Sequence, residues 1–258
     1  MQATANLSFT RFLFVVARRE DDAFQARLRA AGGLVARGFF NDFDADGSKD
    51  PQPHETIQFL VSDSASSGDS AIAAARYVVQ VTGKYRPRLL EVDAELRRRL
   101  GDLAAVVALE GAERALRYTS PELHELAYRR AAPRRSGRVA PHAFILPISK
   151  TPDWWAKPPL ERHAYFYPHV DGETGCAAPG HAQSAEPGIA TIFRRLYHNP
   201  DGYQRSGEFD FLTYFECDSD HQETFHRIHR ALRDTTRNPE WRYVQEGPLW
   251  SGRRVLKF

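Results

Sequence analysis

Apolar and polar residues recur along this chain in two rhythms, one typical of strands and one typical of helices. In the first half, short runs rich in Phe, Val or Leu predict strands over residues 7–17, 34–40 and 56–61. Acidic starts, apolar residues at helical spacing or a high Ala content predict helices over residues 21–31, 71–81 and 89–100. Residues 103–118 show neither rhythm clearly and receive no assignment.

The second half repeats this order of elements. Strands are predicted over residues 142–148, 189–197, 209–216 and 250–255, with extended structure over 242–244. Helices are predicted over residues 159–167 and 222–233. Two successive βαββαβ units are typical of tandem ferredoxin-like halves, so the predicted fold class is α+β. We assign residues 1–131 and 142–258 to the two halves, and the basic stretch 131–141, which contains Pro and Gly, to a linker.

The composition limits the kind of protein this can be. Hydrophobic residues make up 42% of the chain, charged residues 26%, and the net charge is +2, which indicates neither disorder nor a nucleic-acid-binding surface. No apolar run approaches the roughly 18 residues that a membrane span requires. Residues 9–16 lack the flanks of a signal peptide, and two cysteines make no disulfide framework. We therefore expect a cytoplasmic protein without a membrane or nucleic-acid partner.

The stretch from Ala140 to His169 holds the most candidate chemistry. If residues 159–169 are helical, His169 lies at the helix end, where its imidazole can project into a cavity and bind iron. The alternative is a surface or capping histidine. The aromatic residues that could form the apolar walls of a porphyrin site, or else an ordinary core, are Trp154, Trp155, Phe144, Phe166 and Phe193.

Basic residues in the same region could neutralise haem propionates or bind an anion. Lys150 and Arg162 are candidates for the propionates, with solvated surface charge as the alternative. Arg194 and Arg195 interrupt an apolar strand, and alternation sends them to opposite sheet faces. The inward one needs a bound anion or an internal salt bridge, because an unpaired buried guanidinium costs several kcal/mol. With no CxxCH motif and Met1 as the only methionine, any haem is non-covalent and lacks a methionine ligand.

Four segments, in the order LPISKTPDWW, RRLYH, DFLTYFE and LRDTT…WRYVQEGP, together resemble the chlorite dismutase family of haem proteins, which includes chlorite dismutases and coprohaem decarboxylases. The resemblance covers most of residues 142–252. It implies two ferredoxin-like halves that form a dimeric α+β barrel within one chain, with haem b in the second half. It also implies a small anionic oxidant as substrate and a homopentamer as the assembly.

The resemblance assigns roles to particular residues. His169 matches the axial ligand of the haem iron, and Trp154 and Trp155 match the tryptophan pair beside the haem. Lys150 matches a basic residue near the haem edge, and Arg194 matches the distal arginine. The predicted cofactor-binding residues are His169, Trp154, Trp155, Lys150, Arg162 and Phe193, and the predicted catalytic residue is Arg194.

Three features depart from the family pattern. The loops 170–188 and 198–208 are longer than in typical members. The carboxylate that hydrogen-bonds the axial histidine falls in an altered segment, where Glu240 is the nearby candidate. His142 stands where one branch of the decarboxylases has a catalytic tyrosine. We therefore expect a haem b-dependent oxidoreductase that cleaves chlorite to chloride and O2, or cleaves peroxide. The alternatives are a haem-handling protein without turnover and a decarboxylase that uses His142.

A second motif lies in the first half, where residues 42–50 open with the D-x-D-x-D-G pattern of a calcium loop. The position of its last ligand, normally Glu, is held by Pro53, and the preceding stretch is predicted to be a strand rather than a helix. An acidic, solvated loop is therefore the preferred interpretation, with calcium binding as the alternative.

Overall fold

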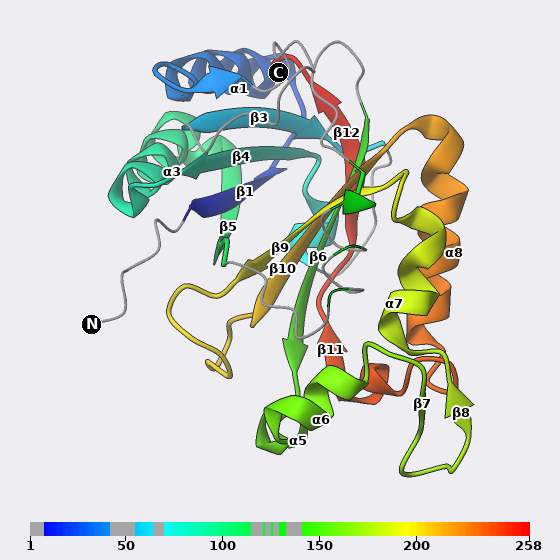
Figure 1. The fold of residues 1–258 in the computed structure, drawn as a ribbon. Helices are drawn as coiled ribbons and strands as arrows, with labels where there is room; N and C mark the ends of the chain where they lie inside the picture. The colour runs from blue at the N-terminus through cyan, green and yellow to red at the C-terminus, as the bar shows by residue number, and fades with distance from the viewer. Residues whose placement is uncertain are drawn as a thin grey trace.

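A ten-stranded sheet, antiparallel except for the pairing of β2 with β3, forms the centre of the molecule (Figure 1). The computed structural model describes residues 8–41, 55–63, 70–114, 121, 125, 129–132 and 141–258. The strands are β1 (Phe9–Ala17), β2 (Phe40–Asn41), β3 (Thr56–Val61), β4 (Tyr77–Gly83), β5 (Ala104–Ala112), β6 (His142–Lys150), β9 (Phe193–His198), β10 (Phe211–Cys217), β11 (Val244–Glu246) and β12 (Trp250–Val255). A separate small hairpin consists of β7 (His169–Val170) and β8 (Ala177–Ala178).

Helices cover the sheet at two places (Figure 1). In the first half, α1 (Asp22–Val35) and α3 (Arg86–Leu100) lie against β1, β3 and β4, and α2 (Ala71–Ala74) is a single turn. In the second half, α7 (Gly180–Ala185) and α8 (Gln222–Arg233) lie beside β6, β9 and β10. The short helices α5 (Pro152–Ala156) and α6 (Pro159–Ala164) follow the end of β6, and a 3-10 helix, η6 (Pro239–Tyr243), precedes β11. Each half therefore repeats the βαββαβ order, which confirms the predicted α+β class.

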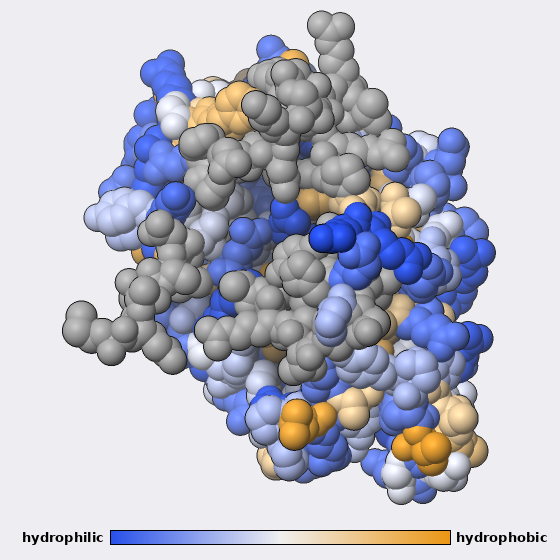
Figure 2. Space-filling view, viewed as in Figure 1, coloured by the Kyte–Doolittle hydropathy of each residue, from blue (hydrophilic) through white to orange (hydrophobic). Residues whose placement is uncertain are grey.

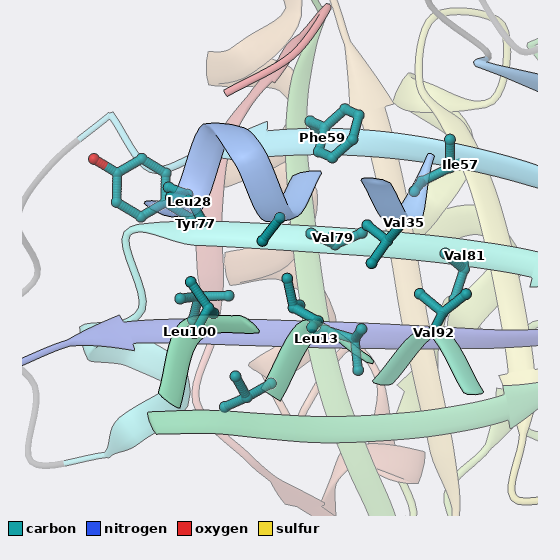
Figure 3. Close-up of a cluster of buried hydrophobic side chains, with 14 of the residues drawn as sticks. Leu13, Leu28, Val35, Ile57, Phe59, Tyr77, Val79, Val81, Val92 and Leu100 are labelled. Atoms are coloured by element: carbon teal, nitrogen blue, oxygen red, sulfur yellow. The ribbon is translucent and has the colours of Figure 1, made fainter. Parts of the chain in front are cut away.

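The helices of the first half are held by one buried face each. Leu28 and Val35 of α1 are buried at helical spacing and pack against Leu13 of β1 and Val79 of β4 (Figure 3). Asp21 caps the helix, because its Oδ1 accepts a hydrogen bond from the backbone N–H of Phe24 at 2.9 Å. This apolar contact and the cap fix α1 on the outer face of the sheet.

The opposite sheet face encloses a second core to which both halves contribute. Phe12 of β1 and Leu60 of β3 pack there with Ile145 of β6, Leu212 of β10 and Trp250 of β12, all of which are almost fully buried. Because residues from both halves fill this one cluster, the two ferredoxin-like halves share a core.

The strands follow one another in a ring order, β10-β9-β5-β1-β4-β3-β12-β6, and β6 pairs with β10 again. The junction of the two halves on one side is narrow, since β5 and β9 are paired at a single position, Ala112 with His198. On the other side β12 pairs with both β3 and β6. The sheet is therefore strongly curved, and the closed barrel stays a prediction.

Three predicted elements of the first half differ from the structure. The helix predicted to stop before Gly32 continues to Val35, because burial of Val35 and the preceding face outweighs the cost of about 1 kcal/mol for each glycine. The strand predicted over residues 34–40 is consequently reduced to β2. The helix predicted over residues 71–81 is one turn, α2, followed by β4, whose residues are buried on both sheet faces and thus show no alternation.

In the second half, the predicted helix that should carry His169 is also wrong. The helix α6 ends at Ala164, and His169 begins β7 instead. Pro168 disfavours helical conformation in the residue before it, which explains the early end. The strand predicted over residues 189–197 begins only at Phe193, whereas α8 and β12 have the predicted bounds. The calcium-like stretch 42–53 and most of the linker lie outside the described residues.

The outer surface in this view is mostly hydrophilic, with two separate apolar spots at the lower edge, near α6 and near the hairpin β7–β8 (Figure 2). The exposed large apolar residues of these elements are Leu160 and Val170. Over the described ranges of the chain, no helix is long and apolar enough to cross a bilayer.

Candidate functional site

The strands β6, β10 and β9 present a regular grid of side chains on the sheet face beside α7 and α8. Directly paired residues on adjacent antiparallel strands point to the same face, so the register defines three rows. The rows are Phe144–Phe215–Arg194, Leu146–Thr213–Leu196 and Ile148–Phe211–His198. The β9 and β10 members of these rows are only half-buried, whereas their neighbours Tyr197, Leu212 and Tyr214 are fully buried on the other face. The grid is therefore an apolar floor with Arg194 near one end and His198 near the other.

The floor is bounded at each end by aromatic side chains. Phe225 of α8 stacks on Phe144 with ring centroids 3.7 Å apart, next to the row that holds Arg194. At the other end Trp155 packs over Phe211 and stacks on Tyr203, with centroids 6.1 and 4.4 Å apart. The middle row of small and aliphatic side chains lies between these two walls.

A buried ion-paired cluster lies where β6 ends. Lys150 donates to Glu240 of η6, with Nζ 2.5 Å from Oε1, and His181 of α7 lies with Nδ1 3.0 Å from Oε2 of the same carboxylate. Lys150 and Glu240 are almost fully buried, at 7% and 5% exposure. A carboxylate at such a site is expected to stay ionised only when it is paired.

The charges in this cluster follow from burial and pairing. Burial alone would raise the pKa of Glu240, but the charge of Lys150 and the hydrogen bonds from His181 and Lys150 lower that pKa to about 2. Burial lowers the pKa of Lys150, although the attraction of Glu240 opposes this. Glu240 is therefore the anion around which the two other side chains are organised.

The hydrogen bond to Glu240 fixes the tautomer of His181. The ionised carboxylate only accepts, so Nδ1 of His181 carries a proton, and in the neutral imidazole the lone pair is on Nε2. The backbone N–H of His181 also donates to the carbonyl of Tyr165 at 3.0 Å, which holds the start of α7 against the end of α6. A histidine oriented in this way through one ring nitrogen is prepared to bind a metal through the other.

The predicted ligand His169 has different partners. Its Nδ1 donates to the carbonyl of Tyr167 at 2.8 Å, its ring packs edge-on against Tyr165, and its Nε2 is buried with no hydrogen-bond partner in the described part of the chain. His169 thus has a free lone pair, but Glu240 pairs with His181. His169 as the ligand stays a prediction, and the structure adds His181 as a second candidate.

The predicted tryptophan pair contacts Lys150 of the buried cluster and Phe211 of the floor. Trp154 is buried, and Nζ of Lys150 lies 4.0 Å from the centroid of its ring. Trp155 donates from Nε1 to the buried carboxylate of Asp210 at 3.2 Å. The same carboxylate accepts the backbone N–H of Lys150 at 2.8 Å, so Asp210 links both predicted residues.

The predicted basic residues differ in position. Arg162 lies over the Trp155 ring at 5.3 Å, and its Nε is buried with no hydrogen-bond partner among the residues described. Arg194 is on the grid face, and Arg195 is on the other face, where it pairs with Glu113 at 3.0 Å, so the predicted alternation of the two arginines is confirmed. Phe193 lies in the shared core beneath Arg195, so the structure does not support its predicted contact with the cofactor.

Sequence reasoning missed a polar group at the far end of the floor. His198 Nδ1 lies 2.7 Å from the hydroxyl of Tyr203, which also accepts from Arg114 at 3.1 Å. Because Arg114 can only donate, Tyr203 donates its own proton to His198. Burial, helped by the charge of Arg114, lowers the pKa of His198 to about 4. His198 is therefore neutral near pH 7.

No protein-family model and no curated protein matches the chain. Its structure is similar to that of chlorite dismutase from Candidatus Nitrospira defluvii in complex with imidazole, with a TM-score of 0.68 and 20% identity over 98% of this chain and 92% of that chain. It is also similar to TA0507, which is named provisionally as a chlorite dismutase, with a TM-score of 0.60 and 14% identity over 96% and 95% of the two chains.

The chain has the chlorite dismutase fold. This confirms the two ferredoxin-like halves that the sequence resemblance implies, and the structural match covers both halves rather than only the second. At these identities the likeness to chlorite dismutase concerns the fold, and the chemistry has to be argued from the residues of this chain.

The residues fit the haem that the resemblance implies. The site offers a histidine whose Nε2 lone pair is fixed by a buried carboxylate, a half-buried apolar floor, and the guanidinium groups of Arg194 and Arg162. No group of three or more His, Cys, Asp or Glu side chains suited to a bare metal ion occurs in the described ranges. An oriented histidine beside an apolar floor and two guanidinium groups is a set that can hold a porphyrin through one histidine ligand.

Proposed function

We propose that the chain is a haem b-dependent oxidoreductase of the chlorite dismutase family, which acts on a small anionic oxidant such as chlorite or peroxide. The observation that carries this proposal is the buried cluster of Lys150, Glu240 and His181 beside a sheet face that presents Arg194. By the sequence resemblance, Lys150 and Arg194 match residues at the edge and on the distal side of the haem. The homopentamer implied by the resemblance belongs to the same proposal.

We assign the axial ligand to His181 rather than to His169. A ligand histidine normally donates its second ring proton to a carboxylate or a carbonyl, and a carboxylate makes the imidazole a stronger donor to the metal. His181 has Glu240 in that place, whereas His169 has the carbonyl of Tyr167. The loop between His169 and Arg194 is longer than in typical family members by about a dozen residues, and counting from His181 removes that excess.

When bound, haem supplies a redox-active iron that can cleave the oxidant. The chain supplies the surroundings. Glu240 holds the proton on Nδ1 of His181 and keeps the ring oriented. Arg194 offers several N–H donors in a fixed fork, which suits an oxyanion and keeps a departing anion close enough to recombine. The apolar floor lowers the local dielectric and so strengthens the attraction between Arg194 and the anion.

The direct test is to mix haem-reconstituted protein with chlorite and to measure O2 with an electrode and chloride by ion chromatography. We expect one O2 and one chloride for each chlorite consumed. Haem binding without O2 release from chlorite and without peroxide consumption would overturn the oxidoreductase proposal.

The alternative of a haem-handling protein without turnover rests on the enlarged loops. One of them, 198–208, contributes Tyr203, which stacks on Trp155 at the edge of the site. The alternative of a decarboxylase based on His142 is weaker, because the ring nitrogens of His142 already lie near Asp63 and Ser219, at 3.2 and 3.3 Å. Mass analysis of porphyrin after incubation with coprohaem and peroxide separates that alternative from the other two.

A further inference from the structure

The segment 168–179 leaves the body of the molecule and returns to the place where it started. Just outside it, the carbonyls of Tyr165 and Phe166 accept the backbone N–H groups of His181 and Ala182 at 3.0 and 3.1 Å. At Gly180, where φ is +78°, a Cβ atom would lie 2.3 Å from the carbonyl oxygen of Tyr167. The segment is therefore a closed excursion that includes the hairpin β7–β8 and ends two residues before His181 (Figure 1).

A buried, two-pronged ion pair fastens this excursion to η6. Asp171 is 2% exposed, and its Oδ1 and Oδ2 lie 3.1 and 2.8 Å from Nη1 and Nη2 of Arg242. Thr174 supports the carboxylate from within the hairpin, with Oγ1 2.6 Å from Oδ2. Hydrogen bonding to Arg242, strengthened by its charge, holds the pKa of Asp171 well below its usual range.

The other end of this ion pair is close to the candidate ligand. Arg242 lies two residues after Glu240 on the same 3-10 helix, and Glu240 accepts the hydrogen bond of His181. The excursion is thus linked to the candidate ligand in two ways: the chain continues from it through Gly180 to His181, and Asp171 holds Arg242 of the helix that presents Glu240. The position of Glu240 matters because a supporting side chain has to be held within about 0.5 Å of the geometry that its hydrogen bond requires.

The same arginine has a second acidic partner that provides a matched control. Glu173 lies 3.0 Å from Nη1 of Arg242 and accepts from the hydroxyl of Tyr243 at 3.0 Å, but its side chain is 59% exposed. Exposed pairs contribute little, whereas breaking a buried pair leaves an uncompensated charge. Asp171 and Glu173 therefore differ in burial while they share Arg242.

We propose that Asp171 is a positioning residue for the axial ligand: through Arg242 it fixes η6, and so sets the length of the hydrogen bond between Glu240 and His181 and the donor strength of the imidazole. This inference rests on the proposed function, because it takes His181 as the ligand. It extends that function, because the Asp171–Arg242 pair belongs to the excursion that distinguishes this chain from typical family members.

The test compares Asp171→Asn with Glu173→Gln in the full-length protein. Asparagine keeps the shape of the side chain but turns an N–H group towards the guanidinium, so one prong of the pair is lost. In haem-reconstituted protein, we expect Asp171→Asn to lower the iron–histidine stretching frequency in resonance Raman spectra and to speed transfer of haem to apomyoglobin by about 10- to 100-fold. Glu173→Gln should change the transfer rate by less than about fivefold.

A second readout does not need haem. In the haem-free protein, the Nδ1 proton of His181, held by Glu240, should give a downfield NMR signal protected from exchange, and Asp171→Asn should shift it upfield and weaken its protection. Arg242→Lys, which keeps the charge but not the fork, should move every readout in the same direction. Wild-type values for both Asp171→Asn and Arg242→Lys would overturn the positioning role. Failure of the wild-type protein to bind haem would instead contradict the proposed function, and the NMR comparison would still decide the positioning role.

Discussion

Nδ1 of His181 and Oε2 of Glu240 lie 3.0 Å apart, in a cluster where Lys150 lies on the other oxygen of the same carboxylate. The three groups come from α7, η6 and β6, which are distant in the sequence. Their meeting is the feature on which the account of this protein depends, because it gives one histidine an oriented lone pair and a buried negative charge behind it.

The first prediction concerns the stability of this cluster. Glu240→Gln removes the negative charge and leaves the buried ammonium of Lys150 without its counter-ion, so we expect the free energy of unfolding of the haem-free protein to fall by about 3–5 kcal/mol. Urea unfolding followed by circular dichroism measures this. Replacing Lys150 by Met in the same variant should recover part of the loss, and Glu173→Gln, in an exposed pair, should cost less than about 1 kcal/mol. A loss for Glu240→Gln no larger than that of Glu173→Gln would show that the buried pair contributes nothing.

The second prediction concerns pH. The pKa of His198 is about 4 in the folded protein and close to 6.5 when unfolded, so between these values the unfolded chain binds a proton that the folded protein does not. Stability from this group is complete above pH 6.5 and is lost as the pH falls towards 4, by up to about 3 kcal/mol. His198→Gln should flatten that part of the stability curve. A midpoint near 6.5 in an NMR titration of His198 would contradict the prediction.

The third prediction concerns the distal side. Arg194 lies on the grid face, so Arg194→Gln should leave haem bound and weaken cyanide or fluoride binding by about 1.5–3 kcal/mol, the usual contribution of a charge-assisted hydrogen bond. Arg195→Gln is the control, since Arg195 lies on the other face and pairs with Glu113. Spectrophotometric titration of the reconstituted variants measures both. If Arg195→Gln weakens anion binding and Arg194→Gln does not, the chemistry lies on the opposite face of β9.

Local patterns predicted much of the fold because each half repeats a simple order of elements. The helix α8 and the strand β12 have the predicted bounds, since an amphipathic period and a short apolar run identify them without tertiary context. The strand β4 was not predicted, because residues buried on both sheet faces lose the alternation that identifies a strand. The end of α1 was missed because tertiary burial of Val35 outweighed the local preference of two glycines.

The candidate site shows a different limit of the sequence. Arg194 lies on the grid face because alternation along β9 determines where it points, and Trp155 packs over Phe211 at the end of the floor. The roles of these residues towards a cofactor stay predictions. The position of His181 could not be read in this way. The segment 168–179 folds back on itself, so the chain resumes after it at the point where it left, and the histidine that meets Glu240 stands after the excursion and not before it. Only the tertiary pairing shows which histidine Glu240 supports.

The most direct test of the central claim is the haem titration of His181→Gly and His169→Gly, followed by their Soret spectra. We expect His169→Gly to bind haem with a wild-type spectrum. His181→Gly should lose or strongly shift the Soret band and should regain it when imidazole, which can occupy the vacated space, is added. A wild-type spectrum for His181→Gly, together with loss and imidazole rescue for His169→Gly, would contradict the account and restore His169 as the ligand.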